Sequence, residues 1–391
     1  MQAERISGLK PTAVNTILAE VKALRTQGRN IISLMRGEPD FPTPPHIVEA
    51  ATAALRAGRT SYPENRGEQR LREAVALKLE RDNGIAYDPG TEILITDGAT
   101  LGIYAAVMSL LGPGDDILVP DPIYDAYASP IWLTGAEVRR VRSSRGEDGR
   151  FEINVKALEE ARTPTTRALL LNDPWNPVGT VLTREELTKI AEFVLRHNLF
   201  LISDEIYEAI TYGTSTHTSP AALSPEVRNR CVVVNSLSKT YSMTGWRLGY
   251  CAAPEKIIRA MLLVLQQSSR GPATFIQDAG AAALGGPQDC VAEMRSAYTD
   301  RRHTVSEILA GLPLVDVLEP EGGFFTTLDI GRMGRTSDEV RRHLLNECGV
   351  AVVHGRAYGE CGEGTLRVSF GSGGETLRAG LKSLREGLQS I

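Results

Sequence analysis

The sequence predicts an α/β protein in which a large domain with a mostly parallel sheet carries a smaller α+β domain. Three observations support this fold class. The chain has 391 residues, more than one simple hydrophobic core usually holds. Between about residues 91 and 253, short apolar runs alternate with helical patterns, as in sheets with helices on both faces. After Pro254 the pattern changes to long helices followed by short strands, which indicates a second unit.

Six apolar runs predict strands of the large sheet, and they lie at 92–96, 116–119, 167–171, 199–203, 231–234 and 247–252. The runs 168–171 and 231–234 lack the polar and apolar alternation of a half-exposed strand. We therefore expect these two to be central strands that are covered on both faces.

The helical patterns are marked by capping signals and by apolar periodicity. Residues 183–197 form a predicted helix with Thr183 as N-cap and Glu186 three residues later, a capping box. In the smaller unit, helices are predicted at 255–267, 277–284 and 290–309, and strands near 324–328, 351–353 and 365–369.

The domain organisation is predicted from these changes in pattern. The Pro-rich turn at 38–45 separates an N-terminal segment from the main sheet. We assign 46–280 to the large domain, and 1–45 together with 281–391 to the small domain, the two forming one unit over about 30–388. The N-terminal segment is expected to pack on the small domain.

Composition and termini exclude several classes of protein. With 42% apolar residues, 23% charged residues and a net charge of −5, the chain is an ordinary globular one without the basic footprint of a nucleic-acid binder. Five scattered cysteines without a C-x-x-C pair predict neither a disulfide framework nor a zinc site, and no metal site is expected. The first residues lack a signal-peptide profile, and no apolar run approaches the roughly 20 residues of a membrane span. We expect a cytoplasmic protein that binds no membrane.

Two polar residues follow neighbouring predicted strands. Asp204 ends the run at 199–203, and Lys239 follows the run at 231–234. Open α/β sheets bind ligands at the carboxyl ends of their strands, so both side chains should reach one crevice. A lysine can form an imine with an aldehyde cofactor, while a carboxylate keeps a pyridinium nitrogen protonated. Taken singly, Asp204 would be a turn or helix cap and Lys239 a surface lysine, but the pair indicates pyridoxal 5'-phosphate (PLP) chemistry.

The stretch 236–247, SLSKTYSMTGWR, resembles the lysine signature of the class I and II aminotransferases, which belong to PLP fold type I. The resemblance runs from about Ile6 to the C-terminal helix and implies a seven-stranded, mostly parallel large sheet. It places the Schiff base on Lys239 and the cofactor phosphate on Ser236 and Arg247, whose hydroxyl and guanidinium groups are strong phosphate partners. The alternative is a strand-end turn and a surface ion pair.

Further cofactor-binding residues follow from the same resemblance. The turn 96–102 leads from a strand into a helix, and in the family pattern Gly98, Ala99 and Thr100 form the phosphate cradle at the helix N-terminus. Alone, such a turn is weak evidence.

Three more residues resemble those that surround the cofactor ring. Asn176, in the N-x-x-N-P-x-G pattern at 172–179, and Tyr207 match the donors to the phenolic oxygen, which lower the imine pKa. Tyr124 matches the aromatic residue that stacks on the ring. The alternatives are a turn for Asn176 and core positions for the tyrosines; Tyr127 and Trp132 are interpreted only as core aromatic residues.

The resemblance also implies a dimer and a substrate site. Tyr62 matches the tyrosine that crosses to the phosphate of the neighbouring subunit, which implies a homodimer with shared sites. Arg367 matches the arginine that grips the α-carboxylate, and Asn176 can reach the same group. Gly37 matches the glycine whose backbone approaches the substrate, which a residue without a Cβ permits. A solvent-facing strand arginine is the alternative for Arg367.

The implied reaction moves an amino group between an L-amino acid and a 2-oxo acid by a ping-pong mechanism. Lys239 is the anchor and acid-base catalyst, with Asp204 and Tyr207 as the other catalytic residues. Carbon-sulfur lyases and aminocyclopropane-carboxylate synthases of the same fold use the same lysine and aspartate, so elimination stays an alternative. A non-enzymatic sensor module would need a DNA-binding domain, for which the N-terminus has no room.

The substrate side chain is not fixed by these patterns. Some bacterial aspartate aminotransferases carry a lysine at the position of Thr100, where this chain has none. Arg36, Arg270 and Arg356 are unusual for their segments, and one of them could bind an acidic side chain. Other stretches resemble arginine–pyruvate aminotransferases, which would need an acidic pocket instead.

Overall fold

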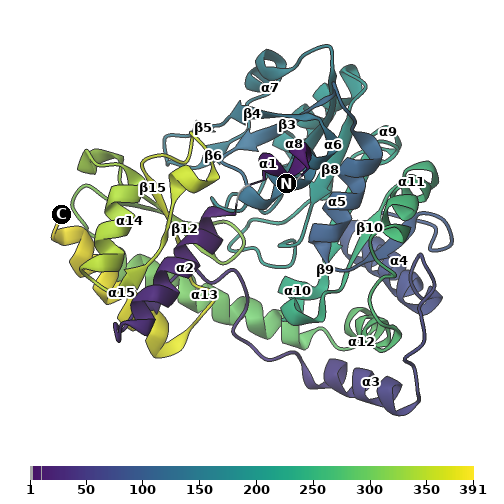
Figure 1. The fold of residues 1–391 in the computed structure, drawn as a ribbon, viewed down its shortest axis with the longest axis horizontal. Helices are drawn as coiled ribbons and strands as arrows, with labels where there is room; N and C mark the ends of the chain where they lie inside the picture. Colours follow the sequence, from purple (N-terminus) through teal and green to yellow (C-terminus); the bar gives the residue numbers. More distant parts are fainter. Residues whose placement is uncertain (1–2, 10) are drawn as a thin grey trace.

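The computed structural model describes residues 3–9 and 11–391, and its centre is a seven-stranded sheet. The strand order is β2-β10-β9-β8-β7-β3-β4, and β10 alone in this sheet runs antiparallel to its neighbours (Figure 1). The strands are β2 (Ile93–Thr96), β3 (Asp116–Asp121), β4 (Glu137–Arg142), β7 (Thr166–Asn172), β8 (Phe200–Asp204), β9 (Cys231–Ser236) and β10 (Gly249–Ala252). The predicted seven-stranded, mostly parallel sheet is confirmed.

Helices cover both faces of this sheet. One face packs on α5 (Ala99–Leu110), α6 (Ala128–Thr134) and α11 (Glu255–Gln266). The other packs on α3 (Pro45–Arg56), α4 (Gln69–Asn83), α7 (Val155–Ala161), α8 (Arg184–Arg196) and α12 (Thr274–Gly285). In β7, Leu169 and Leu171 enter one of these cores, whereas Ala168 and Leu170 enter the other. This two-sided burial explains the unbroken apolar run in β7.

The predicted capping box fixes the start of α8. The Thr183 hydroxyl accepts a hydrogen bond from the Glu186 backbone N–H at 3.2 Å, and the Glu186 carboxylate accepts one from the Thr183 N–H at 2.7 Å. The remaining short elements around the large sheet are β5 (Ser144–Arg145), β6 (Phe151–Glu152), α9 (Pro225–Arg228) and α10 (Leu237–Thr240), with 3-10 turns at Asp125–Tyr127, Pro220–Ala222 and Thr244–Trp246.

The smaller domain is built on a four-stranded antiparallel sheet. Its strands are β11 (Asp316–Leu318), β12 (Phe325–Asp329), β14 (Val353–His354) and β15 (Thr365–Ser369), and its helices are α13 (Asp289–Leu309), α14 (Ser337–Asn346) and α15 (Gly374–Gln389), with 3-10 turns at Gly331–Met333 and Gly355–Tyr358. The strand predicted at 351–353 is divided in two. β13 (Val350–Ala351) pairs with β1 (Ile32–Ser33), whereas β14 pairs with β15, because the chain changes partner at Val352.

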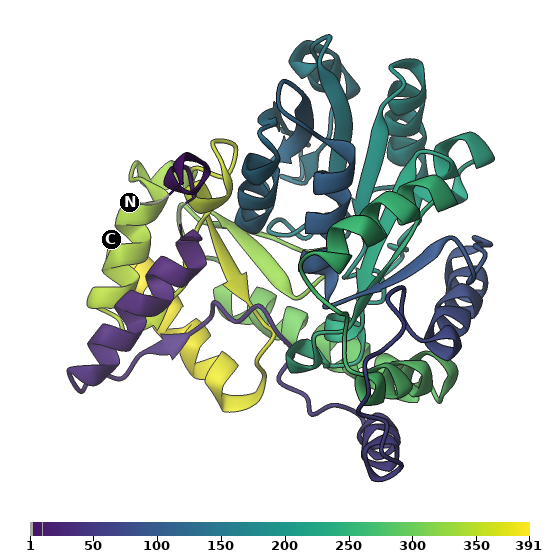
Figure 2. The same ribbon diagram turned by 45° about the vertical axis from the view of Figure 1, so that its right-hand side comes forward.

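The N-terminal segment reaches both domains (Figure 2). α1 (Glu4–Ser7) lies against α6, where the Trp132 indole N–H donates to the Arg5 carbonyl at 2.9 Å. α2 (Ala13–Thr26) packs on the small domain through Ile17 and Val21, as expected for this segment. Its path therefore crosses the junction between the two domains.

The predicted domain boundary at 280/281 falls inside α12, which packs against α3 and α4. We propose to place the boundary in the short connection between α12 and α13, since both neighbours of α12 cover the large sheet. Among the described residues, no helix combines the length and apolar character that a membrane crossing requires.

Candidate active site

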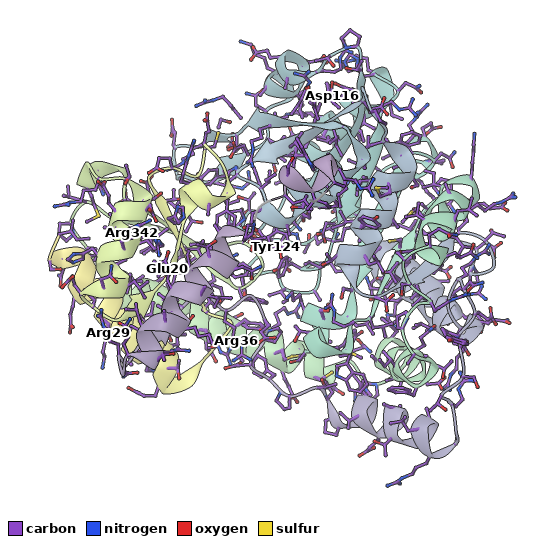
Figure 3. All side chains as sticks on the ribbon, viewed as in Figure 1. Glu20, Arg29, Arg36, Asp116, Tyr124 and Arg342 are labelled. Carbon is purple, nitrogen blue, oxygen red and sulfur yellow. The ribbon has the colours of Figure 1, made fainter. Side chains whose placement is uncertain are left out.

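A cavity of about 380 Å³ lies at the carboxyl edge of the large sheet, where the small domain and the start of α2 meet it. Tyr124, from the loop after β3, lies at this junction of the domains in Figure 3. Most of the predicted site residues line the cavity, namely Gly37, Ala99, Thr100, Tyr124, Asn176, Asp204, Tyr207, Ser236, Lys239, Arg247 and Arg367. The fold thus brings together residues that are up to 330 positions apart, from Gly37 to Arg367.

Lys239 lies in the short helix α10 that follows β9. Its Nζ donates to the Gly37 carbonyl at 2.6 Å, which joins the sheet edge to the N-terminal segment. Burial lowers the pKa of Lys239 to about 8, and the positive charges of Arg247 and Arg367 add to this effect, whereas the nearby Glu38 carboxylate opposes it. At a pKa of about 8, roughly a tenth of the amine is unprotonated at pH 7, and this is the form that acts as a nucleophile.

Asp204 is the last residue of β8, and its side chain is almost completely buried. Its Oδ2 accepts a hydrogen bond from the Tyr127 hydroxyl at 2.6 Å, and its Oδ1 accepts one from the Ile206 N–H at 3.3 Å. Burial raises the pKa of Asp204 to about 6, although the Tyr127 hydrogen bond acts in the opposite direction. A buried carboxylate of this kind is stabilised by a cationic N–H donor that enters the cavity.

Tyr127 was interpreted from sequence only as a core aromatic residue, and its contact with Asp204 was missed. Its ring also packs edge-on against Tyr124, with 5.4 Å between the ring centroids. Spacing alone carries no signal for this pair, because 77 residues separate Tyr127 from Asp204. The position of Tyr127 one turn beyond Tyr124 is the one hint that the sequence offers.

Groups that bind anions gather at the start of α5. Gly98 precedes this helix with φ +81°, and no side chain among the described residues caps the N-terminal N–H groups. This φ favours glycine, and a Cβ at Gly98 would lie 2.6 Å from Nη2 of Arg247, so the guanidinium would have to move. Ser236 and Ser238 add hydroxyl groups, 2.7 Å apart. A helix N-terminus with a guanidinium and hydroxyls is suited to a phosphate.

Arg247 has an unusual backbone conformation. It adopts a left-handed conformation, φ +54°, directly after the Thr244–Trp246 turn. Its Nη1 donates to the Thr244 carbonyl at 3.0 Å, its Nη2 makes a longer hydrogen bond to the Asp97 carbonyl at 3.5 Å, and the exposed side chain lines the cavity. The guanidinium therefore keeps donor groups for a ligand.

Arg367 enters the opposite end of the cavity from β15. Its Nη1 donates to Asn176 Oδ1 at 3.1 Å, and its guanidinium lies 4.2 Å from the centre of the Phe325 ring. The Nε atom is buried without a partner among the described residues. Asn176 in turn is held by its backbone N–H, which donates to Asn172 Oδ1 at 2.8 Å. A planar guanidinium with unused donors is suited to a carboxylate.

Tyr207 lies between the two ends of the cavity. It is buried and packs edge-on against Phe324 and Phe325, with centroid distances of 5.6 and 6.1 Å. Burial raises the pKa of Tyr207, so its hydroxyl remains protonated and able to donate a hydrogen bond.

The remaining sequence candidates lie outside this cavity. Tyr62 is 86% exposed, and the guanidinium of Arg270 lies 5.9 Å from its ring. Arg36 is paired with Glu38 at 3.2 Å, and Arg356 with Glu360 at 3.4 Å; both arginines are exposed. Within this chain, none of these four side chains reaches the cavity.

The model of the family "Aminotransferase class I and II" matches residues 29–384. A probable aspartate/prephenate aminotransferase of Aquifex aeolicus is 39% identical and covers 100% of this chain and 99% of its own. Aromatic-amino-acid aminotransferase 2 of Thermococcus litoralis is 37% identical over 99% of this chain and 98% of its own. The Thermus thermophilus aspartate aminotransferase structure with maleate superposes with a TM-score of 0.92 at 33% identity, covering 99% of each chain.

This chain belongs to the class I and II aminotransferases. The enzyme class and fold type inferred from the stretch 236–247 are therefore confirmed. The lyase alternative is not favoured, because the relatives that match this chain along their full length are named as aminotransferases.

The aminotransferase cavity also has a wall that sequence reasoning missed. Thr12, Val14 and Asn15, from the start of α2, line it together with Asp125. The Asp125 carboxylate accepts the Ala13 backbone N–H at 2.9 Å, which fixes the first turn of α2 over the cavity. Burial raises the pKa of Asp125, and its Oδ1 has no partner among the described residues. No motif in the sequence marks this contact, which joins residues 112 positions apart.

Proposed function

We propose that this aminotransferase binds PLP in the cavity through the amine of Lys239 and moves an amino group between an L-amino acid and a 2-oxo acid. The proposal rests mainly on one observation: Lys239 and Asp204 face the same cavity as the uncapped start of α5 and Arg247. When bound, PLP supplies an electron sink that makes the α-carbon of an amino acid acidic. The ping-pong order follows from two half-reactions that share one site.

The roles proposed for the buried groups follow from their charges. Asp204, ionised above about pH 6, would accept a hydrogen bond from the protonated ring nitrogen, and the Tyr127 hydroxyl orients that carboxylate. Lys239 would accept a proton from the substrate α-carbon and donate it to the C4' carbon of the cofactor, with the reverse transfer in the second half-reaction. A lysine pKa of about 8 suits this task, because both protonation states are populated near neutral pH.

We propose that the two ends of the cavity bind different anionic groups, the cofactor phosphate at one end and the substrate α-carboxylate at the other. The backbone N–H groups of Gly98, Ala99 and Thr100, with Ser236 and Arg247, would hold the cofactor phosphate. Tyr207 and Asn176 would donate to the phenolic oxygen of the ring, and Tyr124 would stack on it. Arg367, supported by Asn176, would hold the substrate α-carboxylate, and Gly37 leaves open space beside it.

We further propose that the preferred amino donor carries a large apolar or aromatic side chain. The cationic side chains among the described cavity residues are Lys239, Arg247 and Arg367, and each already has a partner in the scheme above. An acidic side chain would lack a cation and would approach Asp125, whereas Val14, Met35 and Ile103 offer apolar surface. The name of the Thermococcus litoralis relative, an aromatic-amino-acid aminotransferase, agrees with this choice, while that of the Aquifex aeolicus relative would favour aspartate.

The functional unit is proposed to be a cytoplasmic homodimer. Tyr62 is exposed and lies outside the cavity of its own chain, which supports a role at the phosphate of a neighbouring copy. The five cysteines are free in the structure, in agreement with a reducing compartment.

Spectroscopy of the purified protein tests these proposals. With PLP added, we expect a visible absorption band that is lost when phenylalanine or tyrosine is added and returns with a 2-oxo acid, without release of ammonia. Aspartate should convert the band less efficiently. Absence of the band would contradict PLP binding, and faster conversion by aspartate would contradict the apolar donor and direct attention to Arg270 of a neighbouring copy.

A further inference from the structure

A buried histidine joins two loops that carry active-site residues. His217 lies in the segment between β8 and the Pro220–Ala222 turn, and its side chain is 4% exposed. Its Nδ1 is 2.8 Å from Asp173 Oδ2, and its Nε2 is 3.1 Å from Glu205 Oε2. Both carboxylates are completely buried, and none of these three residues lines the active-site cavity.

The charge state of this cluster makes it a rigid connection. Burial alone would lower the pKa of His217, but the hydrogen bonds to Asp173 and Glu205 outweigh burial and raise it to about 10. The imidazolium therefore donates to both carboxylates at neutral pH. The other oxygens are also satisfied, because Asp173 Oδ1 accepts the Leu182 N–H and Glu205 Oε1 accepts the Ser219 hydroxyl, each at 2.7 Å. A fully satisfied buried network of this kind favours one geometry.

Each carboxylate is next in sequence to a residue that belongs to the active site or supports one of its members. Glu205 follows Asp204, and Asp173 follows Asn172. The Asp173 N–H and the Asn172 side chain both donate to the Asp204 carbonyl at 3.0 Å. Asn172 also holds the backbone N–H of Asn176 at 2.8 Å. A shift of either carboxylate is thus transmitted to Asp204 or to Asn176.

We propose that His217 is a positioning residue of this aminotransferase, which fixes the loop of Asn176 against the loop of Asp204 through its two charged hydrogen bonds. The inference rests on the proposed function, since it concerns residues assigned to the cofactor ring and the substrate carboxylate. His217 acts only through its neighbours, and its removal should therefore change how the site binds and titrates rather than abolish the chemical step.

The test uses the double variant D173N/H217Q, which removes one negative and one positive charge and leaves the net charge of the cluster unchanged. In the PLP-loaded protein, we expect the KM for the amino donor to rise about tenfold, with a smaller change in kcat, because Asn176 supports Arg367. The pH midpoint of the visible band should rise by about one unit, since the donors to the phenolic oxygen are displaced.

The matched control is H197Q. His197, the residue after α8, pairs with Glu159 of α7 at 2.8 Å, and neither residue lines the cavity, so this variant should alter neither KM nor the midpoint of the band. A double variant that has a lower unfolding temperature but a KM and midpoint within twofold and 0.2 units of wild type, as rough limits, would show a purely structural histidine.

Failure of the proposed function is a separate result, because wild-type protein would then show no visible band at all. D173N, which keeps the shape of the side chain, decides the question if the double variant does not fold. KM and the midpoint must rise in D173N for the proposal to stand, and unchanged values overturn it.

Discussion

The two ends of the active-site cavity are built in different ways. The end assigned to the cofactor comes from neighbouring strand ends of one sheet and from the stretches 98–100, 204–207 and 236–247. The end assigned to the substrate is assembled from β15, the segment after β1 and the start of α2. At that end the small domain and the N-terminal segment meet the large domain through side-chain hydrogen bonds, such as Arg367 to Asn176 at 3.1 Å and Ala13 to Asp125 at 2.9 Å.

This difference has a physical consequence. Backbone hydrogen bonds between neighbouring strands fix the positions of Asp204 and Ser236, and α10 begins directly after Ser236. Arg367 and the first turn of α2 depend instead on how the domains and the N-terminal segment lie on one another. We therefore expect substitutions at the cofactor end to remove activity, and those at the substrate end to change KM and donor preference.

The largest effect is expected from K239A. Loss of the amine removes the group proposed to form the covalent link and to move the proton, so the turnover number should fall by roughly 10³-fold or more. Steady-state transamination assays measure this, with K189A, an exposed lysine of α8, as the control. Partial recovery of activity with added methylamine would support the role of Lys239 in proton transfer. A K239A variant with wild-type activity would contradict it.

R367K is expected to have the next largest effect, and it acts at the substrate end. Lysine keeps the charge but loses the planar fork, and one charged hydrogen bond contributes about 2 kcal/mol, roughly thirtyfold in kcat/KM. Most of this loss should appear in KM, which distinguishes it from K239A. The exposed R332K serves as control. An unchanged KM would place the α-carboxylate elsewhere.

The same contrast explains what the sequence could and could not predict. The cofactor end is built from short stretches that are each continuous in the chain, so motifs predicted that Ala99, Thr100 and Lys239 lie in one cavity. The contact of Tyr127 with Asp204 and the wall formed by Thr12 and Asp125 depend on long-range packing and were missed. Strand β4 was missed as well, because its arginine-rich sequence, in which Val141 alone is buried, is that of an exposed sheet edge.

Y127F should have an intermediate effect and a definite pH signature. The Tyr127 hydroxyl stabilises the ionised form of Asp204, so its loss should raise the pKa of that carboxyl above its value of about 6. The acid limb of the kcat/KM profile should then shift to higher pH, with activity near pH 8 reduced about tenfold or less. Y104F, on the outer part of α5, is the control. A pH profile that does not shift would show that the Tyr127 hydroxyl does not control the pKa of Asp204.

The smallest effects are expected from R36A and R356A. Both arginines are exposed and paired with neighbouring glutamates, and exposed ion pairs contribute about 0.2–1 kcal/mol, so kcat/KM for phenylalanine should change less than roughly fivefold. Comparison of aspartate with phenylalanine as donor makes the result decisive. If R36A lowers the rate with aspartate much more than with phenylalanine, that arginine turns toward an acidic side chain on substrate binding. The proposed preference for apolar amino donors would then be wrong. The choice of donor would instead depend on how the substrate end closes over the bound amino acid.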